Sequence, residues 1–235
     1  MIRVWHFEIP CVLEFGIWNL FVISLPAAGR EFGIWNFHPG AFPNPYLHPP
    51  IHLRMPSFPS QVTLKNGSII TIRLATIGDA PELIDTVSRY IADSPYIPML
   101  PSEFHPTVEE EEVWIRSFLD KANSLLLVAE HDGRIVGNID LTGSPRAIMA
   151  HTAMVGMGML KEWRGLGLGA ALLKAAIQWA TDNPILEILW LQVYTANAAG
   201  MALYRGHGFV DHGVIPRYFQ HEGQCHDCLT MSRQV

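Results

Sequence analysis

The sequence contains little cysteine, little charge and no long apolar run. Its three cysteines, Cys11, Cys225 and Cys228, are a small and odd number, which argues against a disulfide framework and favours a reducing, cytoplasmic location. No uncharged apolar stretch reaches the length of about 18 residues that indicates a transmembrane helix. A formal net charge of −6 argues against nucleic acid as a partner. We therefore expect a protein whose partners are neither nucleic acid nor membranes.

Residues 1–54 are unlike the rest of the chain. The phrase EFGIWNL (Glu14–Leu20) recurs as EFGIWNF (Glu31–Phe37), and a proline- and histidine-rich stretch follows it. Closely spaced prolines prevent regular helices and strands there. We expect residues 1–54 to be a disordered or non-native extension, with Met55 as the start of one domain over 55–235. The alternative is an apolar leader that itself binds a membrane or a partner, in which case its deletion destroys function.

Two β-hairpins are predicted, each at a pair of turn residues. Apolar and polar residues alternate on both sides of Asn66-Gly67, a pair typical of a type I′ turn. A second pair of apolar strands meets at Asp132-Gly133.

Two helices are predicted from their N-terminal caps. Asp79 and Glu82 have the spacing of a capping box, ahead of an amphipathic segment that ends at Asp93. Thr107 and Glu110 repeat the same device before a second helix. We expect the acidic run in this second helix to be a solvated first turn, favoured by the helix dipole, and not a metal site.

The remaining chain alternates strands and helices. Strands are expected over 151–160, 186–194, 210–218 and 224–232, with a helix after the first and a shorter helix after the second. Together with the hairpins, this pattern predicts a mixed α/β fold in which helices are layered on a sheet.

A glycine-rich loop separates the strand over 151–160 from the helix that follows. Its sequence, RGLGLG from Arg164 to Gly169, lets the backbone bend so that successive N–H groups face one concavity. The helix N-terminus adds unpaired N–H groups and partial positive charge, and Lys161 and Arg164 add full charges. We therefore expect the loop to bind a phosphate-containing ligand.

Two other interpretations of the loop are open. Gly165, Gly167 and Ala170 satisfy the glycine pattern of dinucleotide-binding folds. That reading requires an acid at the end of the next strand, whereas Glu187 lies near its beginning. The second interpretation is a glycine turn with a purely structural role.

Two motifs follow one another from this loop onward. The pattern R/Q-x-x-G-x-G/A is matched by Arg164, Gly167 and Gly169. Downstream, LQVYTANAAGMALYRGHGF fits V-x-x-x-N-x-x-A-x-x-L-Y-x-x-x-G-F, with Gly200 where alanine is usual. The matching residues are Val193, Asn197, Leu203, Tyr204, Gly208 and Phe209. In these motifs the chain resembles the GNAT superfamily of N-acetyltransferases.

The resemblance extends over roughly Val62 to Met231 and implies both a fold and a co-substrate. The implied fold is α/β (α+β), with a mixed, mostly antiparallel central sheet, two splayed parallel strands and flanking helices. The implied co-substrate is acetyl-CoA, with its pyrophosphate on the glycine loop and its pantetheine arm between the strands over 151–160 and 186–194. The cofactor-binding residues implied by the resemblance are Met157, Met159, Leu160, Arg164, Gly165, Gly167, Leu168, Gly169, Ala170, Asn197 and Tyr204.

Catalytic roles are also implied. Tyr204 is expected to protonate the leaving thiolate of coenzyme A, because a phenol with a pKa of about 10 is protonated at neutral pH. Asn197 is expected to hydrogen-bond the cofactor arm. The general base stays open: Glu130 and His151 are candidates from their places near strand ends, and Glu103 is a third from the loop between the first two helices.

The acceptor is expected to be a primary amine on a small molecule, peptide or protein. Tyr96, Tyr218, Phe219 and His221 offer an aromatic, partly polar lining for it. The alternative function is a non-catalytic acyl-CoA sensor, and a homodimer is left open. The pair Cys225 and Cys228, three residues apart in an expected strand, should face opposite sides and so form no metal or redox site.

Overall fold

The computed structural model describes residues 58–221 and 223–235. The expectations for residues 1–54, including the repeated EFGIWN phrase, lie outside the described residues. In chain order the elements are β1 (Ser60–Thr63), β2 (Ile69–Leu74), α1 (Ala80–Asp93), α2 (Val108–Leu119), β3 (Leu125–His131), β4 (Arg134–Gly143), β5 (Thr152–Met159), α3 (Leu168–Asp182), β6 (Ile188–Tyr194), α4 (Ala198–Gly206), β7 (Val210–His221) and β8 (Gln224–Gln234).

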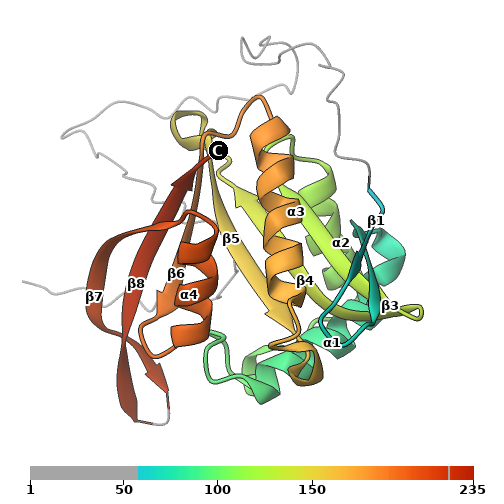
Figure 1. Ribbon diagram of the computed structural model, residues 1–235, viewed down its shortest axis with the longest axis horizontal. Helices are drawn as coiled ribbons and strands as arrows, with labels where there is room; N and C mark the ends of the chain where they lie inside the picture. Colours follow the sequence, from blue (N-terminus) through green and yellow to red (C-terminus); the bar gives the residue numbers. More distant parts are fainter. Residues whose placement is uncertain (1–57, 222) are drawn as a thin grey trace, which may run out of the picture. The chain divides into compact units, whose positions relative to one another are not determined.

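The strands form one sheet of eight in the order β1-β2-β3-β4-β5-β6-β8-β7. Helices α1 and α2 cover one face, and α3 and α4 cover the other (Figure 1). All neighbouring strands are antiparallel except β5 and β6. This arrangement confirms the predicted mixed, mostly antiparallel sheet with flanking helices.

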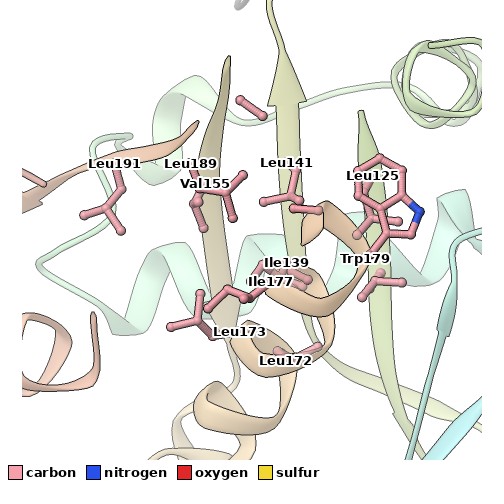
Figure 2. Packing of buried hydrophobic residues seen from close by; sticks show 14 of the residues in the cluster. Leu125, Ile139, Leu141, Val155, Leu172, Leu173, Ile177, Trp179, Leu189 and Leu191 are labelled. Carbon is pink, nitrogen blue, oxygen red and sulfur yellow. The ribbon is translucent and has the colours of Figure 1, made fainter. Parts of the chain in front are cut away.

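The core between α3 and the sheet explains why this helix is so apolar. Leu172, Leu173 and Ile177 on its inner face are buried against aliphatic side chains of β3 to β6, as Figure 2 shows. Each such side chain contributes about 1.5–3 kcal/mol when it is fully buried. The helix that carries the glycine loop is therefore rigidly docked on the sheet.

Both predicted hairpins form, but only one has the predicted type of turn. Asp132 and Gly133 have φ values of 48° and 74°, the two left-handed residues of a type I′ turn. In the β1–β2 hairpin only Gly67 is left-handed, with φ of 84°, and the Leu64 N–H donates to the Ser68 carbonyl at 2.9 Å. The type I′ prediction for Asn66-Gly67 is therefore wrong: the chain uses a longer loop that a single left-handed glycine closes.

The two helix caps also differ in outcome. At α2 the predicted box forms, since Thr107 Oγ1 accepts the Glu110 N–H at 3.2 Å and Glu110 accepts the Thr107 N–H at 2.8 Å. At α1 the box is absent, because both Asp79 oxygens accept hydrogen bonds from Arg73 at 2.8 Å. The Glu82 carboxylate instead accepts the N–H of Ile135 at 3.0 Å.

The sheet opens between its two parallel strands. Their register consists of three pairs, Thr152 with Ile188, Ala153 with Leu189, and Met154 with Trp190. Beyond these pairs β5 continues only with β4, and β6 continues only with β8. The two strands diverge toward their carboxyl ends, where α3 and α4 begin (Figure 1). This confirms the predicted splay.

Candidate active site

The glycine loop sits at the open end of the splay, between β5 and α3. Gly165 and Gly167 have φ values of 75° and 100°, and Gly167 is the N-cap of α3. A Cβ atom on either glycine would meet nothing within 4 Å. Glycine is therefore needed at these positions for the left-handed backbone and not for close packing.

The start of α3 presents free backbone donors. The first hydrogen bond of the helix runs from the Ala171 N–H to the Gly167 carbonyl at 3.1 Å. Within the described part of the chain, the N–H groups of Leu168, Gly169 and Ala170 have no acceptor. Three unpaired donors at the positive end of a helix fit a phosphate group.

Arg164 holds the loop in place. Its guanidinium donates to the Met159 carbonyl at the end of β5 through Nε at 3.3 Å and Nη2 at 3.1 Å, and to the Asp93 carbonyl at the end of α1 through Nη1 at 3.4 Å. The side chain thus links three elements beside the anion-binding amides, and its charge adds to their positive potential.

Gly169 brings the other predicted cofactor residues together. A Cβ atom there would lie 3.1 Å from Met159 Cε, 3.6 Å from Met157 Cε and 3.3 Å from Leu203 Cδ2. Side chains from β5 and α4 thus meet over the first turn of α3. Leu160 differs, because its N–H donates to the Val136 carbonyl at 3.0 Å and is not available to a ligand.

Asn197 caps the helix that carries Tyr204. Its Oδ1 accepts the Gly200 N–H at 2.9 Å. A Cβ atom on Gly200 would lie 2.7 Å from Asn197 Nδ2, so glycine at this position allows the cap to close tightly. The Asn197 amide nitrogen keeps donors for another partner.

Tyr204 lies on α4, on the β6 side of the opening. Its ring is half-buried and packs edge-on against Phe209 with a centroid distance of 5.8 Å. Burial, with a smaller contribution from the charge of Asp140, raises the pKa of Tyr204 to about 12. The phenol is therefore protonated at neutral pH and available as a proton donor.

Two of the bases predicted from the sequence, Glu130 and His151, lie away from the opening, and the third, Glu103, is bound within its own loop. Glu130 accepts a hydrogen bond from Arg73 Nε at 2.8 Å on β3, two strands from the splay. His151 precedes β5, at the closed end where its carbonyl accepts the Ile188 N–H at 3.1 Å. Glu103 accepts the Leu100 N–H at 2.7 Å within its own loop. The structure brings none of these three together with Tyr204.

Two acids that the sequence analysis did not single out lie on the α1–α2 face of the sheet. Asp140 on β4 pairs with Gly156 on β5, and burial raises its pKa to about 6. Glu111 on α2 is buried, and this burial raises its pKa to about 7. A sequence signal for Asp140 exists: it alternates with the apolar Ile139 and Leu141, and glycine stands opposite on the next strand.

An aromatic cluster lies at the end of β6. Tyr194 stacks on Phe219 with centroids 3.9 Å apart and is tilted against Tyr96 at 6.0 Å and His226 at 5.8 Å. Tyr218 completes the cluster by an edge contact of 4.9 Å with Phe219. The structure thus unites three of the four predicted aromatic lining residues, while His221 makes no ring contact within the described residues.

The described residues offer little support for a redox pair, a metal site or a membrane-spanning helix. Cys225 is exposed and Cys228 is buried, which confirms that the two thiols face opposite sides of β8. The described residues contain no group of three or more His, Cys, Asp or Glu side chains that could hold a metal ion. None of the helices in residues 58–235 that the structure describes is long and apolar enough to cross a membrane.

Comparisons with known proteins match this geometry. The family model described as "Acetyltransferase (GNAT) family" matches residues 90–209, the part of the chain that contains the splay and the anion-binding loop. The crystal structure of a GNAT acetyltransferase from Streptococcus pneumoniae is similar with a TM-score of 0.69 and 30% identity, over 71% of this chain and 99% of that one.

The chain is also similar to two other acetyltransferases. The L-amino acid N-acetyltransferase AaaT of Escherichia coli is 26% identical over 55% of this chain and 78% of its own length. A phosphinothricin acetyltransferase from Sinorhizobium meliloti, solved in complex with AcCoA, has a TM-score of 0.64 at 18% identity, over 74% of this chain and 89% of that one. The chain belongs to the GNAT acetyltransferase family and is an acyltransferase with acetyl-CoA as its co-substrate.

Proposed function

We propose that this protein transfers the acetyl group of acetyl-CoA to a primary amine, on a small molecule or on a peptide or protein, by direct attack of the amine. The observation that carries the proposal is the placement of two features at the open end of the splay. Unpaired backbone amides at Leu168 to Ala170 lie after β5, and the protonated phenol of Tyr204 lies after β6.

The opening suits the amide-bearing arm of coenzyme A. Beyond Met154, one edge of β5 has no neighbouring strand, because β6 has diverged from it. Backbone N–H and C=O groups on a free strand edge pair readily with an extended ligand that carries amides. The edge from Val155 to Met159 is therefore the proposed place of the pantetheine arm, with the Asn197 amide as a further donor to it.

The relatives support an amine acceptor without agreeing on one. Besides AaaT they include a putative phosphinothricin acetyltransferase of Bacillus subtilis, 23% identical over 71% of this chain, and an N-alpha-acetyltransferase of Sulfurisphaera tokodaii, 28% identical over 43%. All three are named acetyltransferases, and their names give different acceptors: L-amino acids, phosphinothricin and N-alpha amino groups. The aromatic cluster around Tyr194 offers a wall for the body of the acceptor.

The phenol of Tyr204 is proposed to protonate the departing thiolate. Replacing Tyr204 with phenylalanine removes that proton and leaves the ring contact with Phe209. We expect kcat to fall about 100-fold or more while acetyl-CoA binding, measured by calorimetry, stays within a few-fold of wild type. A wild-type protein that binds acetyl-CoA but acetylates no amine in a broad panel would instead be an acyl-CoA sensor.

A further inference from the structure

We propose that Asp140 is the general base of the reaction and that it takes a proton directly from the ammonium group of the acceptor. The assignment rests on the proposed function, because it requires an amine acceptor. It adds the residue that the sequence analysis left open, and it identifies the face of the sheet from which the acceptor enters.

The position of Asp140 is fixed by the strands around it. Ile139 and Leu141 on either side pack into the core with α3, so Asp140 lies on the opposite face, the one that α1 and α2 cover. Its partner across the ladder is Gly156, two residues past the last β5–β6 pair. The carboxylate therefore lies beside the part of β5 where the sheet has opened.

Gly156 lets the carboxylate reach over β5. A Cβ atom on Gly156 would lie within 3.1 Å of both carboxylate oxygens of Asp140, which no side chain tolerates. The space that a side chain of β5 would fill is thus occupied by an acid from β4. This places Asp140 against the strand whose free edge is proposed to hold the thioester arm.

The carboxylate lacks a cation. Among the described residues, Asp140 accepts from the Thr142 hydroxyl at 3.0 Å and from its own backbone amide, and it forms no ion pair with lysine, arginine or histidine. A buried acid without a positive partner is costly in its ionised form. A cationic amine in front of it would supply the missing charge.

A second hydrogen-bond acceptor without a donor lies two residues before Asp140 on β4. Asn138 is 3% exposed, and its Oδ1 has no hydrogen-bond partner, while the rest of its amide is engaged with Tyr90. Asn138 and Asp140 alternate with Ile139 and therefore share a face. An ammonium group carries three N–H donors and so matches a pair of such oxygen acceptors.

Asp140 and Tyr204 are close enough to influence one another. The charge of Asp140 contributes to the raised pKa of Tyr204 across the opening. One group comes from the β4–β5 side and the other from the helix that follows β6. A base and an acid on opposite sides of a thioester are what the two proton transfers of acetyl transfer require.

Asp140 takes one proton from R–NH₃⁺, and the lone pair of the resulting amine attacks the thioester carbon, forming the C–N bond. The C–S bond breaks, and the thiolate receives the proton of Tyr204. The nitrogen loses its second proton, through solvent, to the tyrosinate, and Asp140 then releases its proton to solvent. The products are the N-acetyl amine, coenzyme A and one proton.

The test compares Asp140→Asn with Glu111→Gln, which also changes a buried acid on the same face into its amide. Steady-state kinetics with an accepted amine are measured from pH 5 to pH 10, and acetyl-CoA binding is measured by calorimetry. We expect Asp140→Asn to lower kcat at pH 7.5 by about 100-fold or more with unchanged acetyl-CoA affinity. The defect should shrink toward pH 10, where the free amine no longer needs a base. Glu111→Gln should keep most of the activity.

The wild-type pH profile provides an independent measurement that needs no variant. With acetyl-CoA saturating, kcat/KM for the amine should rise with an apparent pKa near 6, the value to which burial raises the Asp140 pKa in the protein without amine. Of the other titratable groups that face Asp140, Tyr90 and Tyr204 stay protonated in this range because burial raises their pKa values. Burial raises the Glu111 pKa to about 7, close to that of Asp140. The rise of kcat/KM with pH must therefore persist in Glu111→Gln.

Three results would overturn the assignment. Asp140→Asn could retain more than half of the wild-type kcat, or kcat/KM for the amine could be flat from pH 5 to pH 7.5 in Glu111→Gln. Either result removes Asp140 as the base and leaves the proposed function intact. A wild-type protein that acetylates no amine would remove the proposed function, and the base with it.

Discussion

Replacing Glu111 with glutamine tests whether this buried acid on the α1–α2 face destabilises the fold when it is ionised, because no positive charge is paired with it. Glu111 is 5% exposed, and within the described residues its carboxylate has no ion-pair partner. Glutamine has nearly the same shape and no charge, so the substitution removes the cost of ionising a buried acid and leaves the packing unchanged. We therefore expect the variant to be more stable than wild type at pH 8.

The magnitude follows from the raised pKa. Burial moves the Glu111 pKa from 4.5 to about 7. At about 1.4 kcal/mol per pH unit, this difference corresponds to about 3 kcal/mol of folding free energy. Because the folded-state pKa is the higher one, wild type has the full stability below about pH 4.5 and loses it as the pH rises through 7. Glutamine mimics the protonated acid, so its advantage appears only at the higher pH.

Urea unfolding at pH 4.5 and pH 8 measures the effect. The free energy of unfolding of Glu111→Gln should exceed that of wild type by about 2–3 kcal/mol at pH 8 and equal it within about 0.5 kcal/mol at pH 4.5. The matched control is Glu109→Gln, an exposed acid in the same helix turn, which should change by less than about 0.5 kcal/mol at either pH. Equal stability of wild type and Glu111→Gln at pH 8 would refute the reasoning.

Three further predictions address packing, capping and domain boundaries. Gly158→Ala should lower stability by about 1–3 kcal/mol in thermal melts, because its Cβ atom would lie 2.3 Å from the Tyr90 ring; Gly213→Ala, with nothing within 4 Å, is the control and should change little. Asn197→Ala should cost about 1 kcal/mol of stability through the lost cap and weaken acetyl-CoA binding in calorimetry, and unchanged binding would exclude Asn197 from the cofactor site. A chain that begins at Met55 should fold and keep its acetyl-transfer rate, and a lost rate would favour a functional leader.

The elements were predictable where local rules act alone. The strands around Asp132-Gly133 and the cap at Thr107 formed as expected, because turn conformation and capping involve residues close together in sequence. The glycine loop was predictable for the same reason, since its left-handed residues and its helix are neighbours.

The failures arise where distant residues compete with local ones. Asp79 does not cap α1 because Arg73, on β2, binds its carboxylate with two hydrogen bonds of 2.8 Å. Two hydrogen bonds from a charged guanidinium outweigh the single bond that a neutral backbone N–H of the helix would donate to the same carboxylate. Likewise, a run of four acids predicts a solvated helix turn, and the burial of Glu111 follows only from how α2 packs on the sheet.

The sequence analysis missed the proposed general base for a related reason. Asp140 stands inside an apolar strand, and its place beside the opening depends on the register between β4 and β5 and on the point where β6 leaves β5. Neither the register nor the point of divergence can be predicted from the residues next to Asp140. Glu130 and His151 were chosen from their places near strand ends, and only the tertiary structure shows that β3 is two strands from the opening and that His151 lies at the closed end of β5.

Calorimetric titration of acetyl-CoA into three proteins tests the central claim, that the backbone amides at the start of α3 bind the diphosphate of the co-substrate. Wild type should give saturable heat. Gly167→Asp places a negative charge among these amides and should weaken binding at least about tenfold. Gly133→Asp introduces the same residue at another open, left-handed turn and should bind like wild type. No saturable heat for wild type, or equal affinity for Gly167→Asp and wild type, would contradict the account.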